Sequence, residues 1–439
     1  MLQQRTTALS LVLALGLVAA GCSSGGGVTP TTVPAGTTTM PDTTGTTAAP
    51  GSTAPTTTSA DPEPGLLVWV DEARRAAVET AADAFAAATG VPVRVEVVGF
   101  GDIGRRMKEE AGTGTAADVF LGTHEWVADL AEAGVIAAVD AGARTRDFAP
   151  AGLDAFSLDG RLYGLPYSVE AIALFRNTDL VPDAPATFED LLAVCDDLGD
   201  EVERCLAIPA ADPYYNYPFL ASTGGYVFGR APEGGYDPAD VGLDDADAVA
   251  GFEFLSALVA DGYLDPAVDY GTMTRLFFEG RAAFMWTAQW AVPNADEAVA
   301  AGTLPGYAVS LLPEILGHEA TPLVRAQGFM VAAQSLHPEE ARRFLLDYLA
   351  TTATMVALYE ADPRPPAFLA ALEALAPEPR LEAFAASAAA GTPIPSIGEM
   401  ALVWAPLGEA FLAVYQQTAT PEEALAGAAA QVRIAVADN

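Results

Sequence analysis

The chain has 439 residues, with 58 acidic and 21 basic side chains and a formal net charge of −37 at pH 7. So large a negative charge argues strongly against nucleic acid and anionic membrane surfaces as partners, because both repel an acidic protein. It suits a protein that stays soluble outside the cell. A high-salt habitat and a GC-rich genome are two explanations of the acidity that remain open.

Residues 1–22 predict an export signal. Arg5 supplies a short positive segment, residues 8–20 form an apolar run, and small residues precede Cys22. The run is shorter than the roughly 20 residues of a membrane-spanning helix, which favours a secretory signal. A cysteine directly after small residues resembles a bacterial lipobox, so we expect Cys22 to carry the lipid and become the new N-terminus. An ordinary signal peptide cut near Gly21 is the alternative.

Residues 23–64 consist mainly of Thr, Pro, Gly, Ser and Ala. Such a stretch buries too little apolar surface to offset its ordering entropy, which predicts a disordered tether, open to O-glycosylation. As a flexible coil, about 42 residues span roughly 35 Å. Lipid and tether together predict a soluble domain held near the extracellular face of the cell membrane or in the periplasm.

Cys195 and Cys205 remain once Cys22 is assigned to the anchor. In an exported protein the oxidising environment favours a disulfide, which here would join a helix end to the following strand. Two buried free thiols are the alternative. The three histidines of the chain are scattered without metal-ligand spacing, so we expect no metal site and no cofactor.

The part of the chain after the tether is an α/β region. Its roughly 375 residues exceed what one core usually serves, which predicts two domains. Short apolar runs predict strands at 66–70, 91–97 and 118–121, and apolar residues three and four apart predict helices from 74 and at 103–111 and 125–133. This order predicts right-handed βαβ units and a mostly parallel sheet.

The same alternation resumes further along the chain. It predicts a strand at 172–175 and helices from 187, at 248–261, at 338–351 and from 420. Two lobes of similar type follow. In open α/β sheets ligands bind outside the carboxyl ends of the strands, so we expect the site in the cleft between the lobes.

Signatures of catalysis are missing from the sequence. It contains no GxSxG elbow, P-loop or HExxH motif, and no GxGxxG after a strand, so we expect no enzyme. The many carboxylates leave open a tethered carbohydrate-active enzyme with an acid–base pair across the cleft.

Four segments follow one another along the chain in a recognisable order. They are GLPYSVEAIALFRNTDLVP at 164–182, DPYYNYPFLASTGGYVF at 212–228, FFEGRAAFMWTAQW at 277–290 and IPSIGEMALVW at 394–404. Together they resemble the maltose/maltodextrin-binding proteins, the solute-binding components of ABC importers, from about Gly65 to the C-terminus. Gln289 and Gly398 stand where that family has proline.

The resemblance implies a two-lobed periplasmic-binding-protein fold, with three hinge crossings and a ligand cleft between the lobes. The implied N-lobe comprises 65–168 and 325–376, the implied C-lobe 169–324 and 377–439, and the crossings lie near 168–173, 324–329 and 376–381. It further implies a monomer that closes on its ligand by hinge motion and delivers a maltose-like di- or oligosaccharide to ABC permease subunits. Another solute, such as a polyol or a peptide, is the alternative ligand.

Binding residues carry over onto five positions of the C-lobe and the first crossing. Glu170 and Asp212 stand where the family has acids, Tyr214 where it has a sugar-contacting aromatic, and Trp290 and Trp404 where it has stacking tryptophans. Carboxylates accept hydroxyl hydrogen bonds, and aromatic faces suit the C–H face of a pyranose. The alternatives are a hinge role for Glu170 and core packing for the aromatic residues.

The N-lobe positions match less well. Arg74 stands where the maltose binders have lysine, and Ala73 replaces an acid. Gly122 replaces a stacking tryptophan, Glu125 keeps an acid, and Trp126 stands in place of an arginine. Trp126 could restore stacking from the next turn. These departures favour a di- or oligosaccharide related to maltose, such as trehalose, over a firm assignment to maltose.

Overall fold

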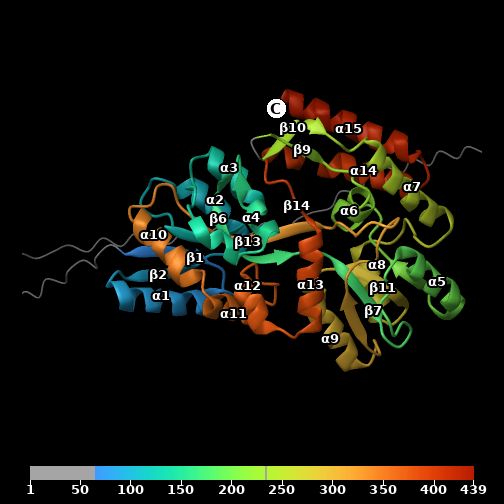
Figure 1. Ribbon diagram of the computed structural model, residues 1–439, viewed down its shortest axis with the longest axis horizontal. Coiled ribbons are helices and arrows are strands. Elements are labelled where there is room, and N and C mark those ends of the chain that lie inside the picture. Colours follow the sequence, from blue (N-terminus) through green and yellow to red (C-terminus); the bar gives the residue numbers. More distant parts are fainter. Residues whose placement is uncertain (1–64, 233–234) are drawn as a thin grey trace, which may run out of the picture. The chain divides into compact units, whose positions relative to one another are not determined.

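The computed structural model describes residues 65–232 and 235–439 (Figure 1). The predicted signal peptide and tether, including the predicted lipidation site Cys22, lie outside the described residues. Within these two ranges no helix is both long and apolar enough to cross a membrane.

The first sheet has six strands among the described residues, in the order β14-β13-β3-β1-β2, with β6 also paired to β13. The strands are β1 (Leu66–Val70), β2 (Val93–Val97), β3 (Val119–Thr123), β6 (Gly164–Glu170), β13 (Leu323–Val331) and β14 (Thr392–Pro393). As predicted, β1 runs parallel to β2 and β3. β13, however, is antiparallel to β3 and β6, so the sheet is mixed rather than mostly parallel. β6 and β13 belong to segments that connect the two lobes, so the βαβ rule does not set their direction.

Helices surround this sheet and complete the first lobe. They are α1 (Arg75–Thr89), α2 (Phe100–Glu110), α3 (Val127–Glu132), α4 (Pro150–Ala155), α10 (Pro338–Phe344), α11 (Thr352–Ala361) and α12 (Leu369–Leu375), with the short hairpin β4 (Ser157–Leu158) and β5 (Arg161–Leu162). Helix α1 buries its predicted apolar face, including Ala77, Ala81 and Phe85, and Gly90 ends it with a positive φ of 77°. The helix predicted at 338–351 is α10 followed by a π-helical turn, Leu345–Leu349.

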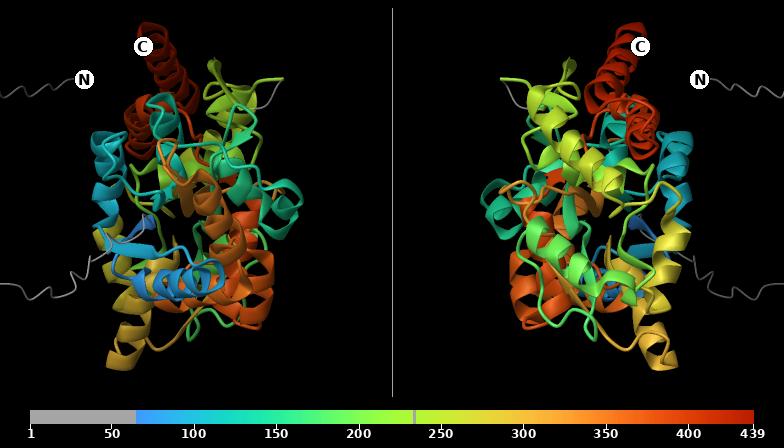
Figure 2. Two further views of the ribbon diagram at one scale, coloured as in Figure 1. Left: turned by 90° about the vertical axis from the view of Figure 1, so that its left-hand side faces the viewer. Right: turned by 90° about the vertical axis from the view of Figure 1, so that its right-hand side faces the viewer.

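The second sheet has the order β12-β7-β11-β8. Its strands are β7 (Ala173–Asn177), β8 (Arg204–Ala207), β11 (Ala282–Thr287) and β12 (Tyr307–Ser310), and the hairpin β9 (Phe228–Arg230) and β10 (Tyr236–Val241) lies outside it. The helices of this lobe are α5 (Phe188–Leu198), α6 (Pro213–Ala221), α7 (Ala246–Ala260), α8 (Tyr270–Phe278), α9 (Val292–Ala301), α14 (Trp404–Tyr415) and α15 (Pro421–Asp438). Figure 2 shows α14 and α15, in red, side by side. A disulfide joins Cys195 on α5 to Cys205 on β8, the pairing that the sequence favours.

Two hydrophobic cores divide the described residues between the lobes. The core of the first sheet takes its buried residues up to Ala171, and that of the second sheet takes them from Ile172. The chain returns to the first core at Val324, directly after Leu323. Helix α13 (Pro379–Ala390) contributes Phe384 to the second core and Ala388 to the first, and the chain returns to the second core at Ile394. The fold is therefore two α/β lobes that exchange chain between them.

Candidate functional site

Strand register places four polar side chains at one edge of the first sheet. On β13, Arg325 pairs with Glu170, the last residue of β6, and Gln327 lies opposite Thr123, the last residue of β3. The carboxyl ends of β3 and β6 therefore meet the first half of β13. β6 continues almost at once into β7 of the second lobe, so this edge faces the junction between the lobes.

Glu170 is held in a single orientation at this junction. Its side chain is almost fully buried, with 2% of the residue exposed. Its Oε1 accepts a hydrogen bond from Gln327 Nε2 at 3.1 Å and another from the guanidinium of Arg364. Arg364 also donates from Nε to Asp362. A carboxylate fixed in this way is preorganised for further hydrogen bonds, because little side-chain entropy is lost on binding.

These contacts belong to a closed ring of hydrogen bonds and ion pairs. The ring runs from Arg74 to Tyr167, Gln327, Glu170, Arg364 and Asp362, and back to Arg74. Burial raises the pKa of Tyr167 to about 12, so its hydroxyl stays protonated and donates to Gln327 at 3.0 Å. Buried polar networks in which each member has a partner rigidify the groups that they contain.

Arg74 acts inside this ring rather than on a cavity surface. It is 6% exposed, donates to Asp71 at 2.6 Å and to the hydroxyl of Tyr167 at 2.7 Å, and pairs with Asp362. A guanidinium this buried requires such acidic partners. Among the cavities described below it lines none, so the structure gives it a positioning contact to Tyr167 and Gln327.

A cavity of about 390 Å³, which we call the hinge cavity, opens beside Glu170. Its lining residues come from both lobes: Phe100, Thr123, Glu125, Glu170, Trp290, Arg325, Gln327 and Arg364. Glu125 and Arg325 form an ion pair in its wall, at 3.4 Å. Three of the residues expected from the sequence, Glu125, Glu170 and Trp290, thus share one cavity. Its volume lies in the roughly 300–1,000 Å³ range of small-molecule sites.

Trp290 supplies the aromatic wall of the hinge cavity. It lies in a short 3-10 turn, Gln289–Ala291, directly after β11. Its indole Nε1 donates to the hydroxyl of Tyr270 at 3.1 Å, and its ring centroid lies 6.1 Å from that of Tyr214. These contacts hold the indole in place while part of it stays exposed.

Tyr214 packs against Trp290 with its ring tilted. It is 8% exposed, and the guanidinium of Arg325 lies 5.3 Å from the centre of its ring. Its buried hydroxyl has no hydrogen-bond partner among the described residues, and burial raises its pKa. Tyr214 lines none of the cavities described in this section, so the structure places it behind Trp290 rather than on the surface of the hinge cavity.

Asp212 and Trp404 lie at a neighbouring cavity of about 570 Å³, whose wall also includes Tyr270. Asp212 caps α6 by accepting a hydrogen bond from the backbone N–H of Tyr214 at 2.9 Å. Tyr270 connects this cavity to the hinge cavity, since its hydroxyl accepts the indole N–H of Trp290. The two tryptophans expected to stack on sugar therefore line adjacent cavities rather than one.

Trp126 fills the space left by two glycines. Its ring packs against Phe100, with centroids 5.3 Å apart. A Cβ added to Gly122 would come within 2.9 Å of this indole, and one added to Gly104 within 3.1 Å. Phe100, not Trp126, lines the hinge cavity. Gly122 and Trp126 thus form a complementary pair, and the indole supports the cavity wall from behind.

Several cavity residues were missed by the sequence reasoning. They are Phe100, Gln289, Arg325, Gln327 and Arg364. Arg325 and Gln327 lie in the crossing expected near 324–329, and Gln289 stands where the resembling family has proline, but neither signal marked them as cavity residues. Arg364 lies in a loop 194 residues from Glu170, and nothing in the spacing relates the two.

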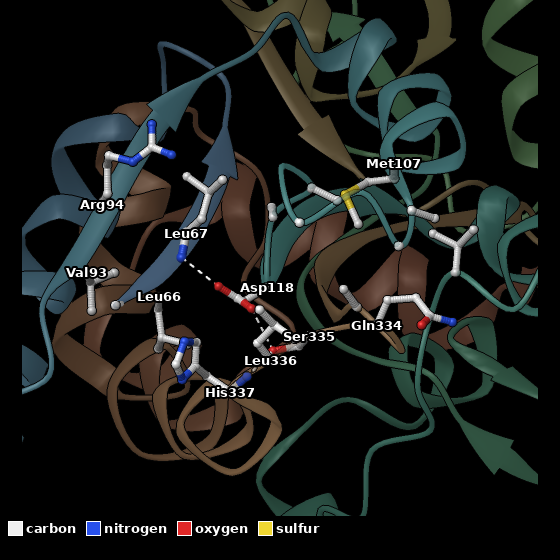
Figure 3. Close-up of a pocket in the computed structure, with 18 of the residues that line it drawn as sticks. Leu66, Leu67, Val93, Arg94, Met107, Asp118, Gln334, Ser335, Leu336 and His337 are labelled. Atoms are coloured by element: carbon white, nitrogen blue, oxygen red, sulfur yellow. Dashed lines mark hydrogen bonds between the residues drawn. The ribbon is translucent and has the colours of Figure 1, made fainter. Parts of the chain in front are cut away.

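A further cavity, of about 400 Å³, lies at the opposite edge of the first sheet, at the amino ends of β1 and β2 (Figure 3). Asp118 is its central polar group. This carboxylate accepts hydrogen bonds from the backbone N–H of Leu67 at 2.8 Å and from the hydroxyl of Ser335 at 2.6 Å. The carboxylate is therefore already hydrogen-bonded within the protein. None of the binding residues expected from the sequence lines it.

Comparison with known proteins agrees with this geometry. The family of bacterial extracellular solute-binding proteins matches residues 80–390. The maltodextrin-binding protein MdxE of Bacillus subtilis is 28% identical over 360 residues, covering 79% of this chain and 84% of that protein. The galactooligosaccharide-binding protein of the same organism is 26% identical, covering 83% and 87%.

Solved structures show the same likeness. An extracellular solute-binding protein from Staphylococcus aureus in complex with maltose has a TM-score of 0.79 and 26% identity, covering 85% of this chain and 98% of that one. A cyclo/maltodextrin-binding protein complexed with maltotetraose also has a TM-score of 0.79, at 25% identity. With its two exchanging α/β lobes, this chain belongs to the bacterial extracellular solute-binding protein family and resembles the maltose-binding proteins within it.

Proposed function

We propose that this protein captures a neutral di- or oligosaccharide related to maltose outside the cell and delivers it to an ABC importer. The observation that carries the proposal is the hinge cavity, which is lined by both the fixed carboxylate of Glu170 and the indole of Trp290. A carboxylate that accepts sugar hydroxyls contributes roughly 1.5–3 kcal/mol for each charged hydrogen bond. The indole offers a face to the apolar side of a pyranose.

The comparisons support the same ligand class. The relatives and structural neighbours carry names that refer to maltodextrin, galactooligosaccharide and maltose. Two similar proteins of Streptococcus pneumoniae are maltooligosaccharide ABC transporter solute-binding lipoproteins, which supports both the importer and a lipid anchor at Cys22. We propose that residues 23–64 act as the tether between that anchor and the binding lobes, and that the protein works as a monomer.

Thermal unfolding against a panel of solutes tests the ligand class. The panel contains glucose, galactose, maltose, trehalose, maltotriose and a galactooligosaccharide, with glycerol and a dipeptide as non-sugar solutes. A sugar present at 100 times its Kd should add about 2.7 kcal/mol to the free energy of unfolding. A response to the dipeptide or glycerol, with none to any sugar, would reject a sugar ligand.

Two measurements separate binding from catalysis and test the anchor. After prolonged incubation with the protein, the bound sugar should be recovered unchanged by chromatography, whereas shortened products would point to a secreted carbohydrate-active enzyme. The unmodified protein should fractionate with membranes, and Cys22→Ser should release it. Membrane association that survives this substitution would contradict lipidation at Cys22.

A further inference from the structure

His124 is a fully buried histidine whose chain neighbours line the hinge cavity. It lies in the short 3-10 turn that follows β3, and none of its surface is exposed. It lines neither the hinge cavity nor a second cavity, of about 370 Å³, which Gln289 lines. The residues before and after it, Thr123 and Glu125, both line the hinge cavity. His124 can therefore act on a ligand only through its neighbours.

The two ring nitrogens of His124 bind the backbones of two distant segments. Nε2 lies 3.1 Å from the carbonyl oxygen of Ile394, and the backbone N–H of Ala326 donates to Nδ1 at 3.1 Å. A carbonyl oxygen only accepts, so Nε2 carries the ring proton and Nδ1 keeps the lone pair that Ala326 needs. Burial lowers the pKa of His124, which favours this neutral form. The carbonyl oxygen of Ala326, 3.2 Å from Nδ1, accepts instead from the hydroxyl of Thr123.

Ala326 lies on β13 between Arg325 and Gln327, which both line the hinge cavity. Side chains alternate along a strand, so these two project from the same side of β13, and the backbone at Ala326 sets their direction. The pairing of β13 with β6 becomes irregular directly after Gln327. The hydrogen bond to His124 holds the strand one residue before this irregularity, where the pairing alone fixes the register least.

Ile394 marks the return of the chain to the second core, directly after β14. Its N–H donates to the carbonyl of Val324 on β13 at 3.0 Å, while its own carbonyl accepts from His124. His124 thus joins the end of β3 in the first lobe to two segments that connect the lobes. Half of the eight residues that line the hinge cavity are chain neighbours of His124 or of its partner Ala326: Thr123, Glu125, Arg325 and Gln327.

We propose that His124 is a positioning residue for ligand binding, whose Nδ1 holds Ala326 so that Arg325 and Gln327 keep their places in the hinge cavity. The inference rests on the proposed function and adds to it a residue that the ligand does not touch. Ile394 is not part of the cavity lining, so the bond from Nε2 to its carbonyl contributes to stability and not to affinity.

Two substitutions separate the two hydrogen bonds of His124. The Oδ1 of asparagine takes the place of Nδ1, so His124→Asn keeps the acceptor for Ala326. The Nε2 of glutamine takes the place of the imidazole Nε2, so His124→Gln keeps only the donor to Ile394. Each variant loses one bond, and both should lower the melting temperature by similar amounts. Titration calorimetry with maltose, trehalose and maltotriose at pH 7.5 should give a Kd within about threefold of the unmodified protein for His124→Asn, and one at least about tenfold larger for His124→Gln.

Hydrogen exchange provides a measurement that needs no ligand. The amide of Ala326 should exchange at least about tenfold faster in His124→Gln than in His124→Asn, because only asparagine keeps its acceptor. His124→Leu, which removes both bonds, replaces the glutamine variant if that does not fold. The same two substitutions at His318, on the exposed surface, are the matched controls and should change neither affinity nor exchange.

The outcomes distinguish the role of His124 from the proposed function. If the unmodified protein binds no sugar of the panel, the proposed function is wrong, and the positioning role is lost with it. If the unmodified protein binds sugar but the asparagine and glutamine variants have equal affinities, or if affinity only follows the melting temperature, His124 has a structural role alone. Equal exchange of the Ala326 amide in both variants would likewise overturn the inference and leave sugar binding in place.

Discussion

Trp290→Ala should weaken sugar binding more than any other single change to the hinge cavity. Aromatic side chains bury roughly 150–250 Å² when fully enclosed. Since the protein already covers much of this indole, a ligand ring would cover about a third of that area, or ~60 Å², worth ~1.5 kcal/mol at about 25 cal/mol per Å². Stacking geometry adds roughly 0.5–1.5 kcal/mol. The sum of about 2–3 kcal/mol corresponds to a Kd that is larger by about 30- to 150-fold.

Calorimetry of maltose and trehalose binding at fixed pH and salt measures this loss. Trp126→Ala is the informative control, because the sequence resemblance also proposes Trp126 as a ligand contact, whereas the structure places it behind Phe100. We expect it to change Kd by less than about fivefold. If Trp126→Ala weakens binding as strongly as Trp290→Ala, or if Trp290→Ala has no effect, the assignment of the hinge cavity is wrong.

Three further predictions concern the groups around the site and the fold. Glu170→Gln should weaken sugar binding at least tenfold. It should also lower the melting temperature by a few degrees, because Arg364 loses one of its two acidic partners. An unchanged melting temperature would show that Arg364 does not take part in the ring of contacts. His124 is fully buried, accepts from the backbone N–H of Ala326 at 3.1 Å and donates to the carbonyl of Ile394 at 3.1 Å, and burial lowers its pKa. The neutral imidazole of His124 therefore contributes fully to the free energy of unfolding above the unfolded pKa of about 6.5. This contribution is lost as the pH falls below that value. Urea unfolding should give a lower free energy of unfolding at pH 5.5 than at pH 7.5. This difference should shrink in His124→Gln but persist in the exposed control His318→Gln. Equal differences in both variants would show that His124 is not the group responsible. Replacing both cysteines of the disulfide with serine should lower the free energy of unfolding by about 2–3 kcal/mol, the value expected for a loop with a sequence separation of 10. If neither this double substitution nor a reductant changes the unfolding midpoint, the disulfide does not form.

Local patterns in the sequence were sufficient to predict several of the strands and helices. The periodicity of α1, with its apolar residues three and four apart, needs no distant partner, and Gly90 ends the helix for a local steric reason. The capping box at Thr187 likewise forms within four consecutive residues, as the sequence predicted. The mixed direction of the first sheet was not predictable in this way, because β13 reaches it from the other lobe.

The candidate site shows the same difference between what local sequence predicts and what tertiary structure decides. The type of each expected residue followed from the sequence: an acid at Glu170 and an indole at Trp290, matched to a resembling family. Which of them meet was decided by tertiary structure. Glu170 is fixed by Arg364, which lies 194 residues away in a loop, and the indole of Trp126 packs into the space beside Gly122. Pairing over such separations depends on how two lobes that exchange chain come together, and no local pattern encodes it. For the same reason, the sequence alone predicted acids and aromatic residues at positions that match a resembling family. Only the folded chain showed that Arg74 lies inside a hydrogen-bonded ring and that Gln289 lines a second cavity.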